Sequence, residues 1–169
     1  MQKVGFFGGC FNPPTNTHIN LANNLIKEGK LDKVIFVPVG DYYQKQDLVP
    51  AIHRYNMLKI ACKNFENLEV EDIASIHQEK LFAKDTFKLI YEKYKNNEEI
   101  YFIMGSDNFQ KMPTWKNYEE IKDKYKYLVL DRTQDISSTV IRNKLQNGEY
   151  VAEYINPKVL EYIEENRLY

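Results

Sequence analysis

The sequence predicts an α/β fold in which a mostly parallel sheet carries helices on both faces. Short apolar runs alternate along the chain with longer segments whose apolar residues recur at helical spacing. This alternation implies βαβ units, which build a parallel sheet covered by helices. No repeat, low-complexity tract or linker divides the 169 residues, a length close to that of one common domain. We therefore expect a single domain over residues 1–169.

The first half of the chain predicts three strands and two helices. Residues 3–7 (KVGFF) form an apolar run that stops at two glycines, which is typical of a strand. The next segment predicts a helix, because Ile19, Ala22 and Leu25 recur on one face. The elements expected in this half are strands at 3–7, 33–37 and 68–70 and helices at 17–27 and 51–63.

The second half repeats the pattern. Residues 100–104 (IYFIM) are apolar throughout, as in a strand buried on both faces, and Gly105 follows at once. The last helix opens with Pro157, a residue favoured in the first helical turn. The elements expected here are helices at 81–94, 138–146 and 157–166 and strands at 100–104 and 125–130.

Ligands of parallel sheets lie beyond the carboxyl ends of the strands, at the point where the strand order reverses. The loops after Phe7, Val37 and Met104 are therefore the candidate sites.

The composition favours a soluble cytoplasmic protein. Net charge is −1, and hydrophobic and charged residues make up 43% and 28% of the chain. The chain has no long basic run, which argues against nucleic-acid binding. A small phosphate ligand is still possible, because it needs only a few well-placed cations. No apolar stretch approaches a membrane span or a signal peptide. The two cysteines, Cys10 and Cys62, lack metal-ligand spacing and are expected to be reduced thiols.

The first segment with chemical content is GGCFNPPTNTH, from Gly8 to His18. Glycines allow backbone N–H groups to approach a ligand closely, and the helix N-terminus is expected to offer unpaired N–H groups and a positive dipole end to phosphate. Thr15 or Asn16 can cap the helix, which places His18 in its first turn. Taken alone, a histidine near a helix start is more often a solvated or internally bonded residue.

The second segment is DISSTVIRNKL, from Asp135 to Leu145. Hydroxyl groups and the Arg142 guanidinium converge on one helix start, which suits an anion. Ordinary capping, with Arg142 in a surface ion pair, would explain the same residues.

The third segment is MGSDNFQKMPTW, from Met104 to Trp115, and it is expected to be a polar loop after Gly105. Asp107 could accept a ribose hydroxyl, and Trp115 could stack on a flat ligand ring. The alternative is that Trp115 covers a core edge.

These segments, in this order, resemble the nicotinate/nicotinamide mononucleotide adenylyltransferases, nucleotidyltransferases with a Rossmann-like α/β fold. The family motif GxFxPx(H/T)xxH is matched by Gly9, Phe11, Pro13, Thr15 and His18, and ISSTxIR by residues 136–142. The tail PKVLEYIEENRLY is similar to the closing helix of the family. Bacterial nicotinate-type members usually carry His at the place of Thr15. The threonine and the segment 38–57 are more similar to eukaryotic and dual-specificity members.

The resemblance implies a role for each matched position. His18 and Arg142 would be catalytic, Lys45 would meet the mononucleotide phosphate, and Thr86 and Trp115 would surround the pyridine ring. The positions implied for ATP are Gly8, Gly9, Cys10, Phe11, Thr15, His18, Gly105, Asp107, Ile136, Ser137, Ser138 and Arg142.

The implied reaction transfers AMP from ATP to nicotinate or nicotinamide mononucleotide and releases pyrophosphate. The attacking phosphate is already an anion, so positioning and charge neutralisation suffice. No carboxylate cluster suggests a protein cage for metal, so Mg²⁺ would arrive with ATP.

Two alternatives stay open: a related adenylyl- or cytidylyltransferase with another phosphate acceptor such as phosphopantetheine, and a non-catalytic nucleotide-binding module. The sequence does not decide between nicotinate and nicotinamide, and a homo-oligomer is compatible with it.

Overall fold

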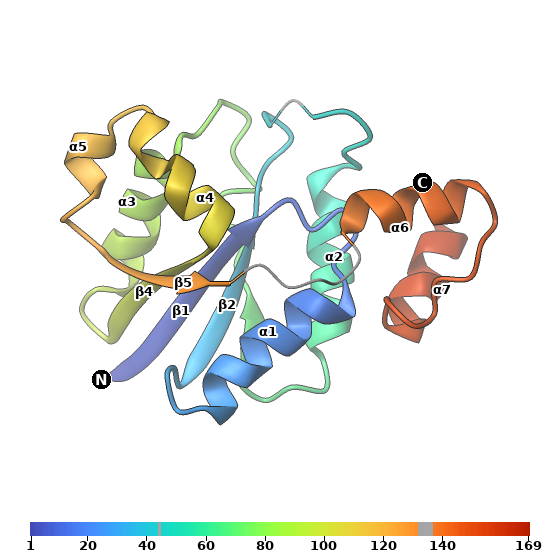
Figure 1. The fold of residues 1–169 in the computed structure, drawn as a ribbon, viewed down its shortest axis with the longest axis horizontal. Helices are drawn as coiled ribbons and strands as arrows, with labels where there is room; N and C mark the ends of the chain where they lie inside the picture. Colours follow the sequence, from blue (N-terminus) through green and yellow to red (C-terminus); the bar gives the residue numbers. More distant parts are fainter. Residues whose placement is uncertain (44, 132–136) are drawn as a thin grey trace.

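The strands form one parallel sheet with β1 at its centre. The structure is a computed structural model that describes residues 1–43, 45–131 and 137–169. The strand order is β3-β2-β1-β4-β5, and every pairing is parallel (Figure 1). The strands are β1 (Gln2–Gly9), β2 (Lys33–Pro38), β3 (Leu68–Val70), β4 (Glu98–Gly105) and β5 (Lys126–Leu130). This arrangement confirms the predicted α/β fold.

The five expected helices are present, with ends within two residues of their predicted bounds. They are α1 (Asn16–Lys27), α2 (Ala51–Cys62), α3 (Ala83–Tyr94), α6 (Ser138–Gln146) and α7 (Pro157–Glu165). None of the helices in the described ranges is both long and apolar enough to cross a membrane.

The segment after β4 was wrongly predicted to be a polar loop. It contains two short helices and a 3₁₀ turn, namely α4 (Ser106–Lys111), η1 (Met112–Thr114) and α5 (Tyr118–Ile121). Helices of four to six residues show too few turns for an apolar stripe to be recognised in a sequence.

The two faces of the sheet carry separate cores. Because successive strand residues point to opposite faces, Phe6 and Phe7 belong to different clusters. The cluster around Phe7 includes residues of α1, α2, α6 and α7, whereas the cluster around Phe6 includes α3. Gly5 leaves room on β1, since a Cβ there would lie 2.5 Å from side-chain atoms of Leu31 and Ile103.

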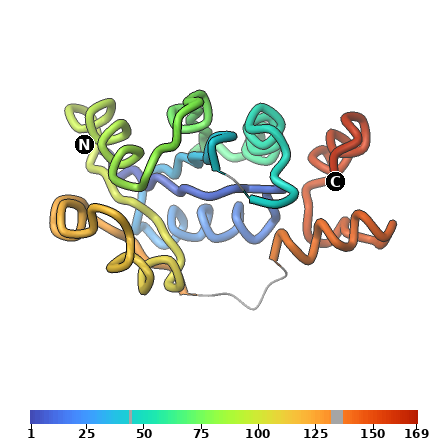
Figure 2. The backbone as a smooth tube through the Cα atoms, turned by 90° about the horizontal axis from the view of Figure 1, so that it is seen from above, coloured from blue at the N-terminus to red at the C-terminus, as the bar shows by residue number. Residues whose placement is uncertain are grey.

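The carboxyl ends of the central strands share one edge of the sheet. Gly9 of β1 is paired with Pro38 of β2, and Phe7 is paired with Ile103 of β4. The crossover from β3 to β4 passes to the other side of β1, so the strand order reverses between β1 and β4. Helices α6 and α7 lie on the side toward which β1 runs (Figures 1 and 2).

Candidate nucleotide-binding site

The loop after β1 turns its aromatic side chain inward. Phe11 is 4% exposed, and its ring packs edge-on against Phe7 and Phe36. A Cβ on Gly9 would lie 3.2 Å from the Phe11 ring, so the glycine is needed for this close approach. At Phe11 only the backbone can therefore serve a ligand. Cys10, between these residues, is a half-buried free thiol.

The start of α1 is a reciprocal cap between Thr15 and His18. The Thr15 hydroxyl accepts from the His18 backbone N–H, and the Thr15 N–H donates to His18 Nδ1 over 2.9 Å. Because Nδ1 accepts this bond, the proton of the neutral ring lies on Nε2, which becomes a donor. The Thr15 hydroxyl, one of the groups implied for ATP, caps the helix in this structure.

The His18 ring is neutral at pH 7. Burial lowers its pKa to about 4, and the ring packs edge-on against Phe11 with 5.1 Å between centroids. His18 can therefore offer a phosphate one hydrogen bond from Nε2 and no full positive charge.

This burial predicts that stability decreases on mild acidification. The pKa of His18 is lower in the folded state, so the unfolded state takes up the proton first, below about pH 6.5. The free energy of unfolding should then decrease by up to about 1.4 kcal/mol per pH unit from this group. Urea unfolding at pH 7, 6 and 5 measures the slope.

The variant His18→Asn is the control, because Asn can accept the Thr15 N–H and does not titrate in this range. Its unfolding free energy should change less between pH 7 and 5. His53 and His77 remain in both proteins and cancel in the comparison. If the unfolding free energies of wild type and His18→Asn changed equally with pH, the pKa of His18 would be the same in the folded and unfolded states.

The N-terminus of α1 is less open to phosphate than the sequence predicted. The N–H of Asn16 donates to the Tyr154 carbonyl over 2.8 Å, and the Asn16 side chain donates to Glu153. The N–H of His18 serves the cap. The expectation that these groups are unpaired is therefore wrong for both residues.

The start of α6 contacts the loop after β1 directly. Ser137 caps the helix by accepting from the Val140 N–H, and the Ser138 hydroxyl donates to the Pro13 carbonyl over 3.0 Å. Arg142 Nη1 donates to the Asn12 carbonyl over 2.8 Å. The second motif therefore lies against the first, as a shared anion site requires. Ile136 and Asp135 lie outside the described residues.

Arg142 is a buried cation. It is 7% exposed, and its Nη2 donates to the Thr139 hydroxyl over 3.2 Å. This burial contradicts the alternative that Arg142 is a surface residue, and within the described ranges no carboxylate pairs with it. A guanidinium has five N–H groups, and three of them make no bond to the described residues. A buried charge without a partner ion is costly, and a bound phosphate would offset that cost.

The loop after β2 and the segment that precedes α3 line a second region. A pocket of about 550 Å³ is lined by Tyr42, Tyr43, Gln78 and Lys80. Thr86 hydrogen-bonds to Tyr42, whose pKa is nevertheless raised by burial. Lys45 is exposed in the same loop. The structure therefore brings Thr86 to a polar and aromatic pocket, in which Tyr42 and Lys80 are additional candidates.

Trp115 follows η1 and is half-buried. It packs against the cluster of Met104, Met112 and Ile121, so one part of its surface does cover a core edge. Its neighbour Lys116 lies 4.6 Å from the centre of the Phe82 ring at the start of α3. This contact places the Trp115 segment beside the helix end that carries Thr86.

Gly105 and Asp107 occupy the start of α4. Gly105 ends β4 and is the N-cap of α4, and a Cβ added to it would meet no atom within 4 Å. Asp107 is exposed in the first turn of this short helix. Both positions follow a strand neighbouring β1, as the third segment predicted.

A fully buried arginine near the site was missed. Arg54 of α2 is 0% exposed and donates to the carbonyl groups of Val49, Val39 and Cys10. The sequence does contain an indication, because Arg54 falls on the buried stripe of Ala51, Met57, Leu58 and Ala61. A cation on the apolar face of a helix becomes buried and therefore needs hydrogen-bond acceptors inside the protein, which the three carbonyl groups provide.

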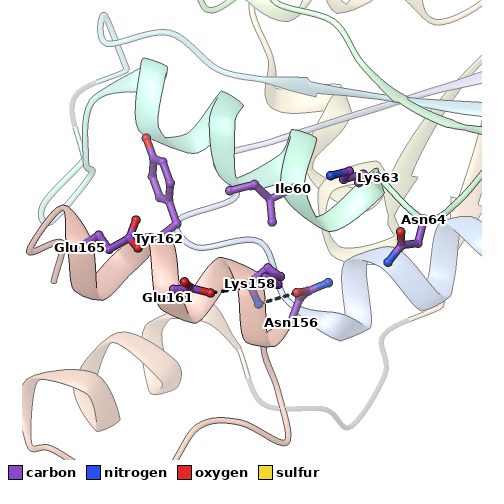
Figure 3. Close-up of a pocket in the computed structure, with 8 residues that line it drawn as sticks. All are labelled: Ile60, Lys63, Asn64, Asn156, Lys158, Glu161, Tyr162 and Glu165. Carbon is purple, nitrogen blue, oxygen red and sulfur yellow. Dashed lines mark hydrogen bonds and ion pairs between the residues drawn. The ribbon is translucent and has the colours of Figure 1, made fainter.

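A second pocket lies away from these residues. It measures about 460 Å³, runs between α2 and α7, and is lined by Ile60, Lys63, Asn64, Asn156, Lys158, Glu161, Tyr162 and Glu165 (Figure 3). None of the predicted site residues lines it. In the described part of the chain no three His, Cys, Asp or Glu side chains are grouped as metal ligands.

Known proteins share both the sequence and the fold. A family model described as cytidylyltransferase-like matches residues 6–144. The nicotinate-nucleotide adenylyltransferase of Bacillus subtilis (strain 168) is 28% identical, covering 100% of this chain and 99% of the relative. The probable nicotinate-nucleotide adenylyltransferase of Shouchella clausii is 30% identical, covering 100% and 97%.

Among solved structures, a putative nicotinate-nucleotide adenylyltransferase from Vibrio parahaemolyticus has a TM-score of 0.80. It is 24% identical, and the match covers 98% of this chain and 93% of that one. The Plasmodium falciparum nicotinic acid mononucleotide adenylyltransferase complexed with NaAD also has a TM-score of 0.80. It is 22% identical, with 99% and 97% covered. These likenesses establish the fold.

The two relatives cited above are bacterial and named for nicotinate. These matches do not compare segment 38–57 separately, so its likeness to eukaryotic members stays a prediction. The family model spans most of the chain, and the Shouchella clausii relative is 30% identical in a match that covers all of this chain and 97% of the relative. The chain therefore belongs to the cytidylyltransferase-like nucleotidyltransferases and, among them, to the nicotinate-nucleotide adenylyltransferase family.

Proposed function

We propose that this protein transfers the adenylyl group of ATP to nicotinate mononucleotide, giving deamido-NAD and pyrophosphate, with nicotinamide mononucleotide as the alternative acceptor. The observation that carries the proposal is the buried Arg142, which has no carboxylate partner in the described ranges and contacts the loop after β1. The names of the relatives favour the nicotinate form. The reaction belongs to NAD biosynthesis, and we place it in the cytoplasm.

The chemistry needs no general base. An oxygen of the mononucleotide phosphate attacks the α-phosphorus of ATP, and the bond to the bridging oxygen of the β-phosphate breaks. Both the nucleophile and the leaving pyrophosphate are anions, so the protein has to align them and neutralise charge. His18 Nε2–H and the three remaining N–H groups of Arg142 are the donors for this purpose.

Mg²⁺ is proposed to enter bound to the ATP phosphates. It would keep several waters, since the described residues provide no dedicated cluster of ligands. The metal would neutralise phosphate charge, while His18 and Arg142 hold the oxygens that it leaves free. Lys45 and the pocket beside Thr86 and Trp115 are proposed for the mononucleotide.

The experiment is a pyrophosphate-release assay with MgATP and three acceptors: nicotinate mononucleotide, nicotinamide mononucleotide and phosphopantetheine. The fastest turnover is expected with nicotinate mononucleotide. Release with phosphopantetheine alone would instead support a related transferase. ATP binding without release in any mixture would support a non-catalytic nucleotide-binding module.

Trp115→Ala should weaken both mononucleotides by similar factors and leave the KM for ATP nearly unchanged. Stacking on a pyridine ring contributes roughly 0.5–1.5 kcal/mol, and both acceptors present a similar face. Trp115 is the only tryptophan, so its fluorescence should change when either mononucleotide binds. Unchanged fluorescence and unchanged acceptor KM would reduce Trp115 to a packing residue. Loss of one acceptor alone would show that the ring discriminates between them.

A further inference from the structure

Two buried polar side chains join the loop after β1 to the loop after β2. The first is Arg54, which reaches out of α2 and binds both loops. Its Nη1 donates to the Cys10 carbonyl over 3.1 Å and to the Val39 carbonyl over 2.7 Å. Its Nε donates to the Val49 carbonyl over 2.8 Å. Its Nη2 lies 3.5 Å from Asp41 Oδ1 and makes no hydrogen bond with the described residues.

The second is Asn12, which reaches from the loop after β1 in the opposite direction. Its Nδ2 donates to the Asp47 carbonyl over 2.8 Å, and its Oδ1 accepts from the Val49 N–H over 3.2 Å. Its side chain is 3% exposed. Val49 is thus held on both sides, by Asn12 at its N–H and by Arg54 at its carbonyl.

A third residue fixes Asn12 from a distant part of the chain. The Tyr169 hydroxyl donates to Asn12 Oδ1 over 2.6 Å, across 157 positions of sequence. Burial raises the pKa of Tyr169, so the hydroxyl keeps its proton and remains the donor. The backbone carbonyl of Asn12 is the group that accepts from Arg142. Asn12 therefore links Tyr169, the loop after β2 and Arg142.

We propose that Asn12, Arg54 and Tyr169, here called the inter-loop brace, are positioning residues that hold the ATP loop and the mononucleotide loop in one fixed arrangement. This inference rests on the proposed function, in which the two loops carry the two substrates of a single displacement. Such a reaction depends strongly on alignment, because a misplacement of about 1 Å can lower the rate about 100-fold. The brace acts through backbone carbonyl and N–H groups of the loops.

The main test compares two Tyr→Phe variants. Tyr169→Phe removes the hydroxyl that holds Asn12 and nothing else. Tyr162→Phe is the matched control. Its hydroxyl lies 2.8 Å from His53 Nδ1 and 3.0 Å from Asn56 Nδ2, on the α7 side that faces α2 (Figure 3).

Tyr169→Phe should lower kcat/KM for both substrates about 10-fold, whereas Tyr162→Phe should stay within about twofold of wild type. Both should lower Tm by similar amounts, since each removes hydrogen bonds from a buried or half-buried hydroxyl. Equal kcat/KM values in the two variants would overturn the proposal.

A double-mutant cycle asks whether Tyr169 works through Asn12. If it does, adding Tyr169→Phe to Asn12→Ala should cause no further loss in kcat/KM. Additive losses would show that Tyr169 acts by another route and would overturn its place in the brace.

Arg54 is tested by Arg54→Lys, which keeps the charge but cannot span three carbonyl groups. Leu58→Ala, one turn further along α2 in the core, supplies a comparable loss of stability without touching the loops. We expect kcat/KM to decrease at least 10-fold more in Arg54→Lys than in Leu58→Ala. Equal activities would remove Arg54 from the brace. If Arg54→Lys does not fold, the comparison of Tyr169→Phe with Tyr162→Phe tests the brace instead.

Failure of the proposed function would be recognised separately. A wild-type protein that binds ATP but releases no pyrophosphate with any acceptor would refute adenylyl transfer. Calorimetric titration with MgATP would still test the brace, because Tyr169→Phe should bind ATP more weakly than Tyr162→Phe. Equal affinities in that case would overturn the brace as well.

Discussion

His18→Ala is expected to lower kcat by about 10²–10³ while the KM for ATP changes little. The His18 Nε2–H is the donor that the Thr15 N–H bond to Nδ1 creates. Its bond to phosphate oxygens should strengthen as negative charge develops during displacement, so the loss should appear in kcat. Steady-state kinetics with saturating MgATP and nicotinate mononucleotide measures it.

Two further substitutions separate the cap from catalysis. His18→Asn can accept the Thr15 N–H in the place of Nδ1 but cannot reach the position of Nε2, so its kcat should stay as low as that of His18→Ala. His18→Gln can place an amide N–H near that position and should recover part of the rate. If His18→Asn turns over at the wild-type rate, His18 serves the helix cap alone.

Arg142→Lys is expected to lower kcat/KM for ATP by about 10- to 100-fold with the fold intact. The guanidinium bonds Asn12 and Thr139 and keeps three N–H groups for phosphate, in a planar fork. An ammonium group cannot satisfy both protein acceptors and a phosphate in the same geometry. Charged hydrogen bonds contribute about 1.5–3 kcal/mol each, which corresponds to the expected range.

Lys144→Met provides the control for charge on the same helix. The half-buried Lys144 has its Nζ 4.0 Å from the exposed Glu149, a distant surface pair, so its loss should leave ATP kinetics unchanged. The same decrease in both variants would mean that α6 contributes a diffuse positive field. Unchanged kinetics in Arg142→Lys would remove Arg142 from the ATP site.

The sequence was sufficient for the sheet and the five longer helices, because these elements have clear local patterns, unlike the short helices after β4. The apolar runs of β1, β2 and β4 and the helical stripe of α1 survive in the structure with nearly the expected bounds. Thr15, one of the two cap residues that the sequence offered, caps α1, and its partner His18 lies in the first turn. Where local pattern and tertiary packing agree, a single sequence predicts the element.

The same reasoning failed where side chains bind distant backbone. Nothing near Asn12 in the sequence indicates that it will bind residues 47, 49 and 169. Whether the amides at the start of α1 are free depends on the carbonyl of Tyr154, which arrives from the far end of the chain. Such contacts follow from the completed topology, which periodicity and capping rules do not contain. Arg54 is the exception, since its place on an apolar stripe was visible.

The strand order also sets the order in which the molecule can fold. The pairings of β1 with β2 and of β2 with β3 lie within residues 2–70, so half of the sheet forms between near neighbours in the chain. The other half begins when Gln2 pairs with Glu98, which closes a long loop and costs more chain entropy. The bonds to Asn12 from Arg142 and Tyr169 span still larger separations. The loop after β1, which precedes most of the chain, is therefore expected to gain its last hydrogen bonds only when these distant partners have docked.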